Sequence, residues 1–173
     1  MEPLQQLAEL IRQRNQIDDA IADILGRPAE KGHISEYIAA IIFDIELCDS
    51  KTNPGADGYF RSGALTGRSV EIRYLALNER VLFEKRPKNF ADFYLVLTGP
   101  YAPAATSKGR KRPFVIEHVF LFEQSTILNL PTKSLSIPRD LWTKAEIYPQ
   151  PRNPLLTLME QQREMLRLFG SVG

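Results

Sequence analysis

Two acidic residues and one basic residue in the middle of the chain have a spacing that suits metal-ion chemistry. Asp57 precedes a predicted β-hairpin, and Glu71 and Arg73 lie two residues apart on its returning strand, residues 69–75. Because side chains alternate between the faces of a strand, Glu71 and Arg73 are predicted to share one face. Antiparallel pairing of the hairpin would bring Asp57 next to Glu71. Carboxylates hold Mg²⁺ through oxygen, and a nearby cation can neutralise phosphate, so the pattern predicts hydrolysis of a phosphodiester.

This order of residues and elements resembles the PD-(D/E)XK nuclease superfamily. The core of that superfamily is a helix, then a β-hairpin that carries Asp and afterwards Asp/Glu-x-Lys, then a further strand and more helix. In this chain Asp57 and Glu71 match the two acids, Arg73 matches the lysine, and Glu36 matches an acid on the preceding helix. The resemblance covers about residues 30–100. It implies an α/β fold of the restriction-endonuclease-like type, with a central mixed sheet, flanking helices, and additional N- and C-terminal helices.

The resemblance also implies the cofactor and the roles of the residues. Asp57 and Glu71 would bind Mg²⁺ or Mn²⁺, and Glu36 would assist them. Ala56 stands where the superfamily often has proline, and Arg73 stands in place of the usual lysine. Arginine keeps its proton and cannot act as a base, although its planar guanidinium can bind phosphate oxygens. Activation of water would therefore fall to the metal alone.

A second resemblance is closer but gives no function. Residues 32–39, 57–60 and 94–100 look like an uncharacterised bacterial family of similar length.

Each of these acids also has an ordinary structural interpretation. The pair Asp57-Gly58 is a common turn dipeptide. Glu71 and Arg73 could form a solvated strand face. Glu36 is predicted in the first turn of its helix, where the helix dipole favours an acid whatever the function.

A basic cluster lies in a predicted loop between prolines, at Lys108, Arg110, Lys111 and Arg112. Such a cluster is often only solvated loop, but it could also contact the phosphates of DNA.

Hydrophobic periodicity predicts the elements around the site. Helices are predicted at residues 4–25, 34–47, 138–146 and 155–169, and strands at 59–60, 69–75, 93–97 and 114–122. The run at 93–97 is apolar throughout, which is typical of a central strand. We divide the single domain, residues 1–173, into an N-terminal helix at 1–26, a nuclease-like core at 30–148 and a C-terminal helix at 154–170.

The composition bounds the remaining possibilities. A chain of 173 residues that is 43% hydrophobic can build one core, and 22 basic against 21 acidic residues give a net charge of +1, so any binding of nucleic acid needs a local patch. Cys48 is the only cysteine, which excludes an internal disulfide and fits a reducing compartment. No signal peptide or long apolar run is present, so we expect a cytoplasmic protein without a membrane partner. The apolar stripe of the C-terminal helix fits either core or a dimer seam, and the terminal helices could form a homodimer.

Two functions of different classes follow from the sequence. The first is a metal-dependent nuclease or nuclease-like DNA-processing protein, which the acidic motif favours. The second is a non-catalytic interaction module that keeps the nuclease-like fold, which the modest charge and Arg73 favour.

Overall fold

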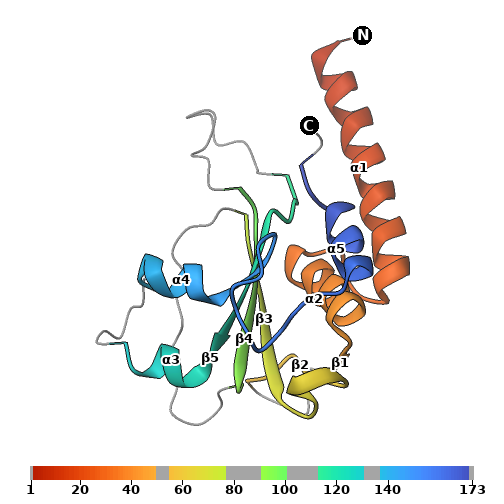
Figure 1. The fold of residues 1–173 in the computed structure, drawn as a ribbon. Coiled ribbons are helices and arrows are strands. Elements are labelled where there is room, and N and C mark those ends of the chain that lie inside the picture. Colours follow the sequence, from red (N-terminus) through yellow and green to blue (C-terminus); the bar gives the residue numbers. More distant parts are fainter. Residues whose placement is uncertain (1, 50–54, 77–90, 101–112, 131–136, 172–173) are drawn as a thin grey trace.

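The fold was analysed in a computed structural model, which describes residues 2–49, 55–76, 91–100, 113–130 and 137–171 (Figure 1). Its helices are α1 (Pro3–Leu25), α2 (Lys31–Phe43), α3 (Gln124–Leu128), α4 (Arg139–Ala145) and α5 (Glu160–Arg167), with one 3-10 turn at Gly63–Leu65. Its strands are β1 (Ile45–Leu47), β2 (Gly58–Phe60), β3 (Ser69–Leu75), β4 (Phe93–Thr98), β5 (His118–Glu123) and β6 (Glu146–Tyr148). None of the helices described is long and apolar enough to cross a bilayer.

The six strands form one mixed sheet in the order β1-β2-β3-β4-β5-β6. All neighbouring pairs are antiparallel except β3 and β4, which run parallel. Every residue of β4 is buried, which confirms the prediction that its apolar run is a central strand. The predicted hairpin is also confirmed, because Gly58 on β2 pairs with Val70 on β3.

Helices cover both faces of the sheet (Figure 1). On one face, α2 and α5 pack on the inward side chains of β3, β4 and β5, among them Ile72 and Leu95. On the other face, Trp142 of α4 packs edge-on against Phe120 and Phe122 of β5, at centroid distances of 4.6 and 5.0 Å. The chain is thus an α/β protein with a mixed sheet between flanking helices, as predicted.

The second predicted helix is wrong at its C-terminal end. The helix stops at Phe43, because Asp44 adopts the left-handed conformation with φ of 54°. The next residues, Ile45–Leu47, form β1 rather than a last helical turn. The helix also begins earlier than predicted, at Lys31, so Glu36 lies beyond its first turn and the dipole interpretation of Glu36 is wrong.

Three further boundaries differ from prediction. Strand β5 begins at His118 instead of residue 114, because Phe114 stacks on Tyr74 at 4.3 Å outside the sheet. The predicted short helix gives way at Glu146 to strand β6, which pairs with β5. The C-terminal helix is much shorter than 154–170, since α5 covers only Glu160–Arg167.

Candidate functional site

Asp57 is held in place by its backbone at the entry to β2. Its N–H donates to the carbonyl of Val70 on β3 at 2.9 Å, and its own carbonyl accepts from the N–H of Cys48 at 2.8 Å. The next residue, Gly58, lies so close to β1 that an added Cβ would sit 2.5 Å from the Glu46 carbonyl oxygen. Asp57 is therefore fixed between β1 and β3, and the tight approach explains why glycine follows it.

The Asp57 carboxylate contacts the backbone of β3. Its Oδ2 accepts a hydrogen bond of 2.6 Å from the Ile72 N–H, and the side chain is partly buried. The pKa of Asp57 is raised to about 6, mainly by burial and in part by the charges of Glu36 and Glu71, while the Ile72 hydrogen bond and Arg73 lower it. Because all three charged side chains act on Asp57, the structure brings the four predicted site residues into one neighbourhood.

Glu71 and Arg73 share one face of β3, as the strand period predicts. They form an ion pair, in which the Glu71 side chain is 18% exposed and the Arg73 side chain is 49% exposed. Their neighbours Val70 and Ile72 point into the opposite core. The shielding of Glu71 argues against a merely solvated strand face, since such a carboxylate needs a compensating partner.

Glu36 is equally shielded and has a partner that the sequence did not reveal. Its Oε2 accepts from the Arg27 guanidinium at 2.6 Å, and its side chain is 18% exposed. Arg27 directly follows the C-terminal glycine of α1, so the turn between α1 and α2 brings the two residues together. No residue spacing in the sequence signals this contact.

Tyr94 is a second residue that the sequence analysis missed. It is paired with Glu71 in the parallel register of β3 and β4 and is 2% exposed. Burial raises the pKa of the Tyr94 hydroxyl to about 12, with a further contribution from the charge of Glu71. The phenol therefore stays protonated at neutral pH beside the acidic site. The parallel pairing of β3 with β4 would have identified Tyr94 as a neighbour of Glu71. The sequence alone does not reveal that pairing.

Known proteins give no guide to this site. No family model and no curated protein matches the chain. The chemistry of the site is therefore argued from its own residues.

The residues of the site fit one mode of metal binding and exclude another. Within the described ranges, no group of three or more His, Cys, Asp or Glu residues is arranged to hold a metal ion. A cage made only of protein ligands is therefore absent from that part of the chain. Mg²⁺ commonly keeps several waters and binds through one or two carboxylates, which is the mode that Asp57 and Glu71 can provide.

The charge balance of the site favours a cation. Three carboxylates (Glu36, Asp57 and Glu71) and two guanidinium groups (Arg27 and Arg73) sum to −3 + 2, or −1, when all are ionised. Among the described residues Asp57 has no ion pair of its own. A bound cation would compensate this charge and favour the ionised form of Asp57.

The predicted basic cluster at Lys108, Arg110, Lys111 and Arg112 lies outside the described residues.

Proposed function

We propose that this chain is a metal-dependent, nuclease-like protein that hydrolyses phosphodiester bonds of DNA, with a restriction-endonuclease-like fold. The observation that supports it is the position of Asp57, a partly buried carboxylate whose pKa is raised by burial and by two neighbouring acids. Keeping like charges together in a shielded place costs stability unless a cation joins them. Carboxylates with strongly perturbed pKa values are found most often at functional sites.

The residues present would divide the work as follows. Asp57 and Glu71 would bind Mg²⁺ or Mn²⁺, and Glu36 would add to the negative potential that attracts the ion. When bound, such an ion neutralises developing charge and lowers the pKa of a coordinated water. Arg73 is half exposed and would bind a phosphate oxygen. It remains cationic, so it supplies no base.

The rival function is a non-catalytic interaction module, and one observation favours it. Both Glu36 and Glu71 already form ion pairs with arginine, which compensates part of the charge that a metal would otherwise neutralise. In that case the acids stabilise the fold, and the chain binds a partner through its exposed apolar surface.

A cleavage assay separates the two functions. With single-stranded and double-stranded DNA and millimolar Mg²⁺ or Mn²⁺, we expect cleavage that EDTA abolishes and that Glu71→Gln lowers by at least about 10-fold. The control is Glu46→Gln, the same change on an exposed strand residue, which should leave the rate unchanged. Arg73→Lys should raise the rate, because lysine can give up a proton and general-base catalysis contributes about 100-fold or more. Cleavage that resists EDTA or Glu71→Gln would contradict the proposal, and absence of cleavage by wild type and Arg73→Lys alike would favour the interaction module.

The role proposed for the basic cluster has its own test. Replacement of Lys108, Arg110, Lys111 and Arg112 by alanine should weaken DNA binding and flatten its dependence on salt. Each lost phosphate contact reduces the slope of log K against log salt by about 0.9 for duplex DNA. Fluorescence anisotropy at several salt concentrations measures this slope. A variant with the wild-type slope would remove the cluster from the DNA-binding surface.

A further inference from the structure

Helix α1 has an apolar stripe that stays largely exposed among the described parts of the chain. The helix has 23 residues and buries none of them. Its large apolar side chains are between 49% and 76% exposed at Leu4, Leu7, Leu10, Ile11, Ile17 and Ile24. Most helices owe their stability to packing of such a stripe, and a large exposed apolar patch marks an interaction site. We therefore expect another surface to pack against the stripe.

The stripe repeats every seven residues. In heptad notation the a positions are Leu4, Ile11, Asp18 and Leu25, the d positions are Leu7, Arg14 and Ile21, and the g positions are Leu10, Ile17 and Ile24. The opposite side of the helix carries Gln5, Arg12, Gln16, Asp19 and Asp23. A hydrophobic repeat of 3.5 residues is the pattern by which helices pair in coiled coils. Only Arg14 and Asp18 interrupt it.

We propose that α1 pairs with α1 of a second copy of this chain in an antiparallel coiled coil. In an antiparallel pair each a residue packs against a d residue of the other helix. With the two-fold axis close to residues 16 and 17, Ile11 meets the partner's Ile21, and Leu7 meets the partner's Leu25. The same register places Arg14 against the partner's Asp18. Each of these three contacts between a and d positions occurs twice, because the two helices are related by a two-fold axis.

The two charged residues select this orientation and this register. A parallel pair would place Arg14 against its own copy and Asp18 against its own copy, and like charges would repel. An antiparallel pair shifted by one heptad in either direction would place both Arg14 and Asp18 against apolar residues, which buries both charges without partners. Within one chain the Arg14 Nε lies 3.5 Å from Asp18 Oδ2, and both side chains are well exposed, so they are accessible to a second helix.

The remaining contacts continue the apolar surface beyond the a and d positions. In the same register the g positions of the two helices face each other, so that Ile17 meets its own copy and Leu10 meets the partner's Ile24.

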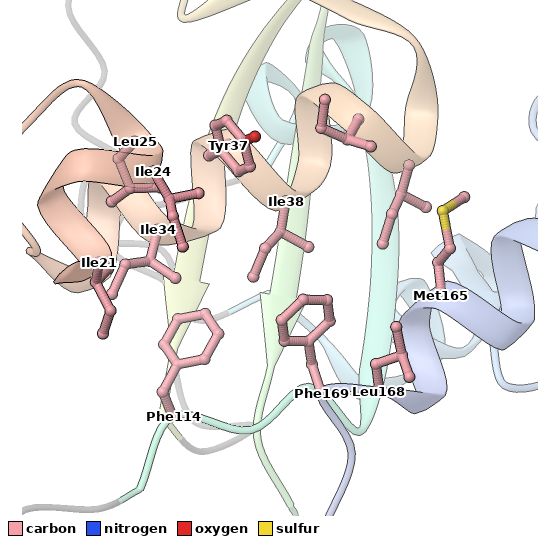
Figure 2. Close-up of a pocket in the computed structure, with 12 residues that line it drawn as sticks. Ile21, Ile24, Leu25, Ile34, Tyr37, Ile38, Phe114, Met165, Leu168 and Phe169 are labelled. Atoms are coloured by element: carbon pink, nitrogen blue, oxygen red, sulfur yellow. The ribbon is translucent and has the colours of Figure 1, made fainter. Parts of the chain in front are cut away.

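Ile24 and Leu25 also line a cavity of about 560 Å³ between α1, α2 and α5 (Figure 2). Figure 2 shows Tyr37 of α2 and Phe169 on the other sides of this cavity. The partner's N-terminal leucines would therefore close a groove that is open in the single chain.

The oligomeric state tests this proposal. Sedimentation equilibrium of the full chain at micromolar concentrations should give twice the chain mass of 19.7 kDa. Ile11→Asp should give the mass of one chain, whereas the control Gln16→Asp, on the polar side of α1, should keep the dimer. Because α1 buries no residue, both variants should keep the cooperative unfolding transition of the remaining domain, even where an unpaired α1 loses helix. A wild type of single-chain mass, or an Ile11→Asp variant that stays dimeric, would overturn the proposal.

The charged pair tests the orientation. Arg14→Glu should dissociate the dimer, and the double variant Arg14→Glu/Asp18→Arg should restore it.

In a Cys48→Ser background, Ile17→Cys should form a disulfide between two chains under oxidation, because the antiparallel register brings residue 17 to its own copy. Leu7→Cys should not form one, since residue 7 meets its own copy only in a parallel pair. Cross-linking of Leu7→Cys but not of Ile17→Cys would overturn the antiparallel arrangement.

Discussion

Replacement of Asp57 by asparagine should stabilise the metal-free protein at neutral pH. The folded-state pKa of Asp57 is about 6, against an ordinary value of 3.8. The folded state therefore holds its proton more tightly than the unfolded state, and stability falls as pH rises from about 4 to about 6. Above that range the wild type carries the full penalty, about 3 kcal/mol. Asparagine has no charge to lose and keeps an oxygen for the Ile72 N–H.

Denaturant unfolding at pH 4, 6 and 8 measures this effect. We expect Asp57→Asn to match the wild type at pH 4 and to exceed it at pH 8. The control is Asp92→Asn, because Arg68 holds the pKa of Asp92 below its ordinary value and hydrogen bonds from Ser69 act in the same direction. That variant should lose stability at pH 8, and the loss should shrink as pH falls through the pKa of Asp92. A loss of stability in Asp57→Asn at pH 8 would show that its carboxylate is an ordinary turn acceptor.

Gly58→Ala should destabilise the fold by about 3 kcal/mol. The added Cβ would lie 2.5 Å from the Glu46 carbonyl oxygen and 2.7 Å from Cγ2 of Ile45. Both atoms belong to β1, and one of them is backbone, so strand β1 has to move away from β2. Because the backbone of Asp57 is hydrogen-bonded to Cys48, directly after β1, and to Val70 of β3, this movement should also displace the carboxylate from Ile72.

The matched control is Gly32→Ala. Gly32 lies in α2, and a Cβ added there would have no atom within 4 Å. Alanine should therefore raise stability by about 0.5 to 1 kcal/mol through helix propensity. Urea unfolding of both variants compares the same substitution in a crowded and an open place. Equal effects on stability would contradict the close approach of β1 and β2.

The sequence predicts well where periodicity and burial agree. Strand β4 is recognisable from the apolar run at 93–97, and it is wholly buried. Strand β3 is recognisable because it alternates, and Glu71 and Arg73 share the face that the period assigns to them. Helix α1 ends at Gly26, whose left-handed φ of 64° suits glycine, as the Gly-Arg-Pro sequence indicates.

The sequence predicts poorly where tertiary contacts decide. Strands β1 and β6 have three residues each, too few for a period, and exist because a neighbouring strand pairs with them. The left-handed conformation of Asp44, which ends α2, has no unambiguous sequence signal. The same limit applies to the site: Arg27 reaches Glu36 through the packing of two helices, and Tyr94 reaches Glu71 through a parallel register.

The most direct test of the proposed site is the response of protein stability to a divalent ion. Thermal unfolding of wild type and Asp57→Asn, each with and without millimolar Mg²⁺ or Mn²⁺, compares all four states. The ion should stabilise the wild type by about 1 to 3 kcal/mol if its concentration is well above the dissociation constant, and it should not stabilise Asp57→Asn. An identical response of the two proteins would remove Asp57 from any metal site and contradict the proposed function.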